Sequence, residues 1–144
     1  MITQNIIDLI KKHEGLCLEP YKDTLGCRTI GYGHLIKPSE DFTTITPDDA
    51  DSILRIDLQT AYDDACSLFP NIDGICEARK AVLIDLSFNL GKEKLSHFHN
   101  FIAAVIAEKF VAAAYELRNS LWFGQVGNRG EEDRLIMLTG EFQV

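Results

Sequence analysis

EGLCLEPYKDTLGCRTIGYGH, which spans Glu14–His34, predicts a helix end followed by a tight antiparallel hairpin. We expect strands near residues 16–22 and 28–32, because the segment between them has the composition of a turn. Within that turn, Gly26 can adopt the positive φ that many hairpin turns require. The sequence therefore predicts a small sheet near the amino terminus.

Two carboxyl groups and a hydroxyl are spaced along this stretch at Glu14, Asp23 and Thr29. Apolar periodicity predicts a helix over about residues 3–14 that ends at Gly15, so Glu14 would lie at the negative end of the helix dipole. That position raises the pKa of a carboxyl, whereas turn amides and water would keep Asp23 charged. Two carboxyls whose pKa values are pushed apart are typical of enzymes that cleave glycosidic bonds.

The order Glu, eight residues, Asp, five residues, Thr, then Ile-Gly-x-Gly-His resembles the motif of the phage-type (T4-like) lysozymes, the glycoside hydrolases of phage endolysins. The resemblance implies a muramidase that cuts the β-1,4 bond between N-acetylmuramic acid and N-acetylglucosamine in peptidoglycan. Glu14 would be the general acid, and Asp23 would position water or stabilise an oxocarbenium-like transition state. Thr29 would help to hold that water, and the anomeric carbon would be inverted. No metal and no cofactor is implied.

The resemblance continues in patches over nearly the whole chain and implies a set of substrate-binding residues. These are Gly31, Tyr32, Gly33, Asn89, Trp122, Asn128 and Arg129. Saccharide would meet backbone amides near Gly31–Gly33 and side chains near Trp122, which Asn89 would face. Arg129 would act as a charge partner and hydrogen-bond donor for Glu14.

A long helix is predicted over residues 47–68, with Thr46 as its N-cap and Pro47 at its first position. The resemblance implies that His34 pairs with Asp57 on this helix. Such a pair would raise the pKa of His34 and hold the sheet against the helix, which is a structural role rather than a catalytic one.

The rest of the chain reads as mostly helical. Residues 76–90 are apolar nearly all round and predict the core helix of a second lobe. We expect Ser96 to cap the helix that follows. The other expected segments are helices near 97–108, 109–118 and 129–138 and a loop over 119–128.

Together these patterns predict a single α+β, mostly helical domain of lysozyme-like fold over residues 1–144. A small antiparallel-sheet lobe of about residues 14–46 would be joined by the 47–68 helix to a helical lobe. That second lobe would comprise about residues 69–144 together with the amino-terminal helix, residues 1–13.

The formal net charge is −8, from 22 acidic and 14 basic residues. This balance argues against nucleic acid as a partner, because such binding relies on basic patches. It also predicts weak or adverse electrostatic steering toward anionic cell walls. No apolar run is long enough for a membrane span, and the first residues read as an amphipathic helix rather than a signal peptide.

Peptidoglycan glycan strands are the expected partner of a monomeric chain. Resemblance to endolysins implies a protein held in the host cytoplasm until a holin releases it to the wall in the periplasm. A virion-associated lysozyme is the other possibility.

The four cysteines, Cys17, Cys27, Cys66 and Cys76, lack the spacing of a metal site. A disulfide is conceivable within the first pair or the second, but a cytoplasmic chain would keep all four reduced.

Three other functions fit parts of the sequence. A lytic transglycosylase would use Glu14 alone and leave a 1,6-anhydro product, although Asp23 and Thr29 argue against it. A catalytically idle wall-binding or virion structural module would not need the three residues in this order. A hydrolase of chitin or chitosan would suit the acidic surface, since chitosan is polycationic.

Overall fold

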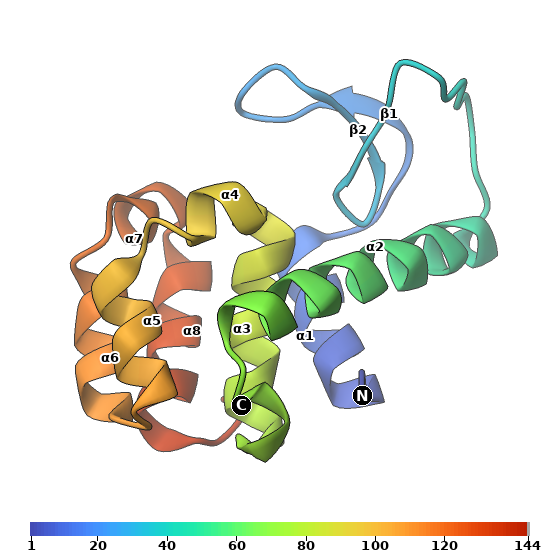
Figure 1. The fold of residues 1–144 in the computed structure, drawn as a ribbon. Helices are drawn as coiled ribbons and strands as arrows, with labels where there is room; N and C mark the ends of the chain where they lie inside the picture. Colours follow the sequence, from blue (N-terminus) through green and yellow to red (C-terminus); the bar gives the residue numbers. More distant parts are fainter. Residues whose placement is uncertain (144) are drawn as a thin grey trace. The chain divides into compact units, whose positions relative to one another are not determined.

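The computed structural model describes residues 1–143 as an α+β protein in which helices predominate, as predicted from the sequence. Its elements in order are α1 (Gln4–Glu14), β1 (Cys17–Lys22), β2 (Arg28–Gly31), β3 (His34–Leu35), α2 (Pro47–Leu68), a 3-10 turn (Ile72–Gly74), α3 (Glu77–Leu90), α4 (Lys92–Leu95), α5 (His99–Ile106), α6 (Phe110–Arg118), α7 (Leu121–Val126) and α8 (Asn128–Thr139). Figure 1 shows these elements along the chain.

Contacts within the chain divide it into two compact units. One unit is Ile2–Thr60, and the other comprises Met1 and the residues from Ala61 onward, so the boundary falls inside α2. The lobe boundaries expected from the sequence stay a prediction.

The first unit contains a three-stranded antiparallel sheet in the order β1-β2-β3. Tyr21 pairs with Thr29 and His34 pairs with Ile30, so β2 lies between the other two strands. Gly26, in the turn that joins β1 and β2, has a φ of 81°, which is the conformation expected for this turn. The two-residue strand β3 is an addition that the sequence pattern did not predict.

A small apolar core supports this sheet. Ile30, Ile45 and Ala50 are buried together, and the partly buried side chains packed against them are Leu18, Tyr32, Ile36, Phe42 and Ile53. The core joins β2 to the first turn of α2, and it fixes the strand that carries Thr29.

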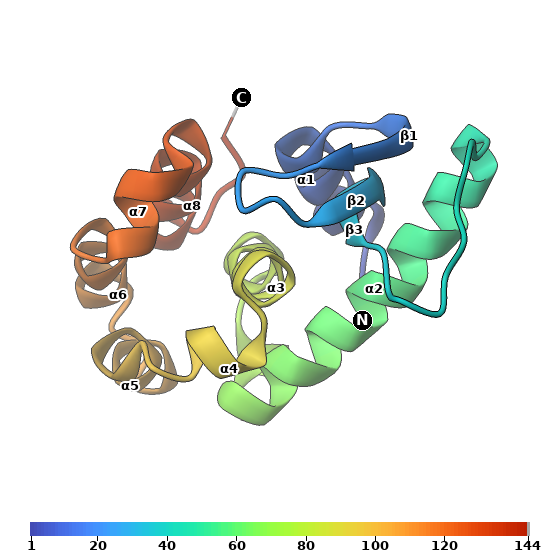
Figure 2. The same ribbon diagram turned by 90° about the horizontal axis from the view of Figure 1, so that it is seen from above.

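The second unit is built around α3. Its buried residues include Ala78, Val82, Ile84 and Leu86, which lie on several sides of the helix. Figure 2 looks nearly along this helix and shows α4, α5, α6 and α8 arranged around it. The prediction of a core helix apolar nearly all round is confirmed.

Two local predictions in this unit were wrong. The segment expected as a loop at 119–128 contains α7, whose N-cap Ser120 accepts a hydrogen bond from the backbone N–H of Phe123 at 3.2 Å. Ser96 is not the cap of the next helix, because it follows the short helix α4 and its hydroxyl donates to Glu93 O. The helices α7 and α4 are too short to show the apolar periodicity on which the sequence prediction depended.

Over residues 1–143, we found no helix whose length and apolar character would allow it to cross a membrane.

Candidate active site

Glu14 is the last residue of α1, the position expected from the sequence. Thr3 caps the other end of this helix by accepting from Ile6 N at 3.4 Å, and Gly15 ends it with a φ of 69°. The Glu14 side chain is half-buried. The carboxyl therefore lies at the negative end of the helix dipole, beside the terminal carbonyl oxygens of α1.

The Glu14 carboxyl lies directly against Gly33. A Cβ built on Gly33 would be 2.8 Å from Cδ of Glu14 and would overlap its Oε1. Gly33 also has a φ of 72°, which L side chains rarely adopt. The glycine in the Gly-x-Gly-His motif therefore leaves room for the carboxyl at the end of α1.

Asp23 is held by the turn between β1 and β2. Its Oδ1 accepts hydrogen bonds from Leu25 N at 2.9 Å and Cys27 N at 2.8 Å. Its Oδ2 accepts no hydrogen bond from any residue in the described part of the chain. One oxygen of the carboxylate thus orients the group, and the other is available to a water molecule or a sugar.

The backbone of Cys27 connects Asp23 to Thr29. Its N–H donates to Asp23 Oδ1, and its carbonyl accepts from Asp23 N at 2.9 Å and from Thr29 Oγ1 at 3.1 Å. Thr29 is buried, with a residue exposure of 3%. Because the Thr29 hydroxyl uses its proton on the Cys27 carbonyl, its oxygen is oriented to accept a hydrogen bond.

Tyr21 is a neighbour of the candidate carboxyls that the sequence analysis did not single out. It pairs with Thr29 across the sheet. Burial raises the pKa of its phenol, and the negative charges of Glu14, Cys17 and Asp23 raise it further. The electrostatic fields of Glu14 and Asp23 therefore both act on the Tyr21 phenol. The Tyr-Lys-Asp order in the motif was the available signal, but a tyrosine in a strand is commonly a packing residue.

The remaining residues of the Gly31–Gly33 segment adjoin α1 and α2. A Cβ on Gly31 would lie 3.6 Å from Ala50 Cβ, so this glycine packs on the start of α2. The Lys11 ammonium group lies over the face of the Tyr32 ring, 5.1 Å from the ring centre.

His34 and Asp57 are brought together. His34 Nδ1 lies 2.7 Å from Asp57 Oδ2, and His34 Nε2 lies 3.0 Å from Oε1 of Glu40, which the sequence analysis did not single out. Burial alone would lower the pKa of His34, but its hydrogen bonds with the two carboxylates outweigh burial and raise it.

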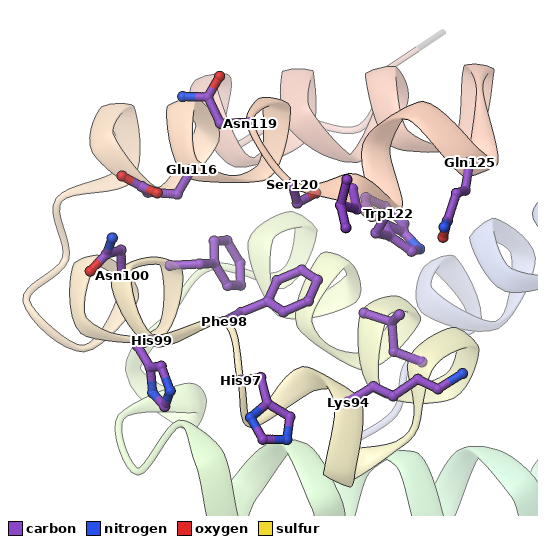
Figure 3. Close-up of a pocket in the computed structure, with 13 residues that line it drawn as sticks. Lys94, His97, Phe98, His99, Asn100, Glu116, Asn119, Ser120, Trp122 and Gln125 are labelled. Atoms are coloured by element: carbon purple, nitrogen blue, oxygen red, sulfur yellow. The ribbon is translucent and has the colours of Figure 1, made fainter.

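In the second unit, Trp122 and Asn89 are also brought together. Trp122 is buried, and its Nε1–H donates to Asn89 Oδ1 at 2.7 Å. Trp122 also lines a cavity of about 540 Å³ between the α4–α5 and α6–α7 segments. Figure 3 shows Phe98 and Trp122 on the inner side of this cavity, with Lys94 and Gln125 at its edge. An aromatic floor with a polar rim suits a sugar or an amide-rich ligand.

Arg129 forms an ion pair with a buried carboxylate that the sequence analysis missed. Its Nη2 is 2.6 Å from Asp85 Oδ1, and its Nε is 3.2 Å from Asp85 Oδ2. Asp85 and the neighbouring Asp133 are both fully buried. The pKa of Asp133 is raised by burial and by the charge of Asp85, against the opposing effect of Arg129. Asn128, the first residue of α8, is exposed.

The candidate residues thus fall into two groups. Glu14, Asp23, Thr29 and the Gly31–Gly33 segment belong to the unit Ile2–Thr60, and the other expected substrate-binding residues belong to the second unit. The cysteines are free thiols in the structure.

Comparison with known proteins adds one decisive observation. The model of the family described as phage lysozyme matches residues 11–131, which include the whole of the first group. The chain belongs to the phage lysozyme family. It is therefore a lysozyme-type cell-wall hydrolase and a glycoside hydrolase.

Relatives of this family member come from a cellular organism and from phages. It is 28% identical to the probable T4-type lysozyme 1 of Dictyostelium discoideum, with 96% of each chain covered. It is 32% identical to the endolysin of Bacillus phage B103, covering 97% of this chain and 55% of that protein. It is 26% identical to the pre-baseplate central spike protein Gp5 of Enterobacteria phage T4, of which it spans 29%.

Proposed function

We propose that this chain is a muramidase that hydrolyses the β-1,4 bond between N-acetylmuramic acid and N-acetylglucosamine in peptidoglycan. The observation that carries the proposal is the backbone of Cys27, whose N–H bonds to Asp23 and whose carbonyl bonds to Thr29. A carboxylate oxygen and a hydroxyl oxygen are thereby fixed together, as the positioning of one water molecule requires. The Glu14 carboxyl, seated on Gly33, supplies the acid.

In the proposed reaction, Glu14 gives its proton to the glycosidic oxygen as the bond from that oxygen to the anomeric carbon breaks. Water adds to the anomeric carbon from the opposite face and gives a proton to Asp23. Thr29 accepts a hydrogen bond from this water and aligns it. The anomeric configuration is inverted, which requires the two carboxyls to be roughly 6.5–9.5 Å apart when substrate is bound.

Substrate binding is proposed to use both groups of residues. The backbone of Gly31–Gly33 would hydrogen-bond to the sugar nearest the acid. The 540 Å³ cavity beside Trp122 supports contact with a further part of the glycan strand, because its rim offers amides and hydroxyls from residues such as Ser120 and Gln125. Asn89, Asn128 and Arg129 complete the proposed set.

We further propose a role in host-cell lysis by a phage or prophage. The chain would act as a monomer, stay in the host cytoplasm until a holin releases it, and reach the wall from the periplasmic side. The endolysins among its relatives support this role, whereas its likeness to a spike protein supports the virion-associated alternative.

The test is the mass of soluble products released from purified Gram-negative sacculi. Hydrated muropeptides with free reducing ends would support a muramidase. Products lighter by one water would assign a lytic transglycosylase instead. Retention of the protein on intact sacculi without products would assign a wall-binding module.

The expected inversion needs a separate measurement. Proton NMR of a soluble glycan fragment during the first minutes of cleavage should detect the α-anomer of the new reducing end before mutarotation. Initial appearance of the β-anomer would contradict inversion and would make Asp23 a nucleophile.

A further inference from the structure

His34 contacts carboxylates on both sides of its ring. Asp57, on α2, is 2.7 Å from Nδ1, and Glu40, in the segment after β3, is 3.0 Å from Nε2. A neutral imidazole has a single N–H and can donate to only one of these groups, whereas an imidazolium donates to both. The arrangement therefore matches a protonated His34.

Glu40 also fixes the path of its own segment. Its Oε1 accepts a hydrogen bond from Lys37 N at 2.7 Å, and its backbone N–H donates to Lys37 O at 2.9 Å. The next apolar side chain, Phe42, meets the His34 ring edge-on with 5.9 Å between ring centres. His34 is thus the common contact of the two side chains that attach residues 37–44 to the sheet.

The charges around His34 come from two segments. Asp57 faces it from α2, and Glu40 faces it from the 37–44 segment, where the Lys37 ammonium group also acts on Glu40. The pKa of Glu40 is lowered by the Lys37 backbone hydrogen bond, against burial, and is lowered further by His34. A cation between two anions is the stable charge state of this cluster.

A surface depression lies beside the turn at residues 37–40. A cavity of about 430 Å³ is lined by Arg28 from β2, Leu35 from β3, and Lys37, Pro38 and Glu40. Lys37 and Pro38 are exposed, so this turn is held by the contacts of Glu40 with Lys37 N and His34, whereas Phe42 also packs on the buried core of the sheet.

We propose that His34, Asp57 and Glu40 form a proton-controlled latch that holds residues 37–44 on the sheet, and that loss of the imidazole proton releases Glu40. A neutral His34 keeps its one N–H toward Asp57, the nearer carboxylate, and turns a lone pair toward Glu40. That contact becomes repulsive, so the Lys37–Glu40 turn loosens as the pH rises. The latch does not depend on the proposed muramidase activity.

The test is an NMR titration of the full ¹⁵N-labelled chain from about pH 5 to about pH 9, either side of the ordinary imidazole pKa. The imidazole ¹⁵N shifts of His34 report its protonation. Hydrogen exchange at the amides of Lys37 and Glu40, corrected for the intrinsic effect of pH, reports the turn. We expect protection at these two amides to fall about tenfold over the range in which His34 titrates.

Glu40→Gln is the diagnostic variant, because glutamine can still accept from Lys37 N but carries no charge. It should lower the pKa of His34 and remove the pH dependence of the Lys37 protection. The matched control is Asp41→Asn, which removes one negative charge from the neighbouring exposed position and should behave as wild type.

Two results would overturn the latch. In the wild-type chain, His34 could titrate while the protection of Lys37 and Glu40 stays constant. In the Glu40→Gln variant, the pKa of His34 could equal that of wild type. If this variant fails to fold, the wild-type titration decides alone, and neither result bears on whether peptidoglycan is cleaved.

Discussion

At the scale of single residues, Gly33 matters both for its backbone conformation and for its contact with the proposed acid, Glu14. Its φ of 72° and its contact with the Glu14 carboxyl both exclude a side chain. We predict that Gly33→Ala lowers turnover at least tenfold, because the methyl group displaces the acid, and costs about 1–3 kcal/mol of stability through backbone strain. Initial rates and urea unfolding measure the two effects.

The control for this variant is Gly124→Ala in α7. Gly124 has helical backbone angles and nothing within 4 Å of a built Cβ. It should keep full activity and should gain, not lose, stability, by about 0.5–1 kcal/mol, because Ala is a better helix former than Gly. Full activity in Gly33→Ala would contradict the placement of Glu14 at the site.

Asp133 carries a prediction about pH and stability. Its pKa is raised well above 3.8 by burial, and the charge of Asp85 and a hydrogen bond with Asp85 raise it further. A raised folded-state pKa gives stability that is complete below the unfolded pKa and is lost as the pH rises toward the folded value. Asp133→Asn should therefore gain stability relative to wild type as the pH rises from about 4 to about 8.

Urea unfolding at several pH values measures this difference. Glu141→Gln, which removes one negative charge at an exposed position, is the comparison. The raised pKa would be contradicted if the stability of wild type relative to Asp133→Asn increased as the pH rises.

Several important residues could not be found from the sequence. Asp85 and Asp133 lie in helices, where an acidic residue is ordinarily solvated, and only the fold shows that they are buried beside Arg129. Glu40 lies in an irregular polar segment that has no periodicity. By contrast, Glu14, Asp23 and Thr29 all lie in the short stretch of sequence from the end of α1 to β2, so local sequence was enough to single them out.

At the scale of elements, the start of α2 depends on reciprocal capping. Thr46 Oγ1 accepts from Asp49 N at 3.1 Å, and Asp49 Oδ2 accepts from Thr46 N at 3.0 Å. We predict that Thr46→Ala lowers the free energy of unfolding by about 1 kcal/mol, because one backbone donor loses its partner. Thermal or urea unfolding measures the loss.

The exposed Thr44, two residues earlier, provides the control. Thr44→Ala should change stability by less than about 0.5 kcal/mol. If Thr46→Ala and Thr44→Ala lowered the free energy of unfolding equally, the loss could not be assigned to the helix cap at Thr46.

Long or well-capped elements could be predicted from the sequence. The helix at residues 47–68 has its expected bounds, and α1 ends at Glu14 as its apolar spacing and Gly15 indicated. The failures were β3, α4 and α7, which have two, four and six residues. Such short elements are stabilised by tertiary contacts, which a local pattern does not record.

At the scale of the whole molecule, the net charge of −8 sets how the protein meets an anionic wall. Like charges repel at long range, and salt shortens that range from about 30 Å at 0.01 M to about 10 Å at 0.1 M. We predict that the rate of sacculus cleavage rises when salt increases over this interval. Turbidity loss measures the rate.

A short soluble glycan fragment, which carries much less negative charge than a sacculus, serves as the comparison substrate. Its cleavage should depend less on salt over the same range, because there is less repulsion to screen. A fall in sacculus cleavage with added salt would mean that a local basic surface governs binding instead of the net charge.

The central claim is that Glu14 is the acid of a muramidase. The most direct measurement compares product release from sacculi by wild type, Glu14→Gln and Glu19→Gln, together with their melting temperatures. The account predicts that Glu14→Gln folds normally and releases no product, because an amide cannot protonate the leaving oxygen, while Glu19→Gln, a change at an exposed strand position, stays active. Substantial turnover by Glu14→Gln, or loss of activity that is matched by loss of its fold, would contradict the claim.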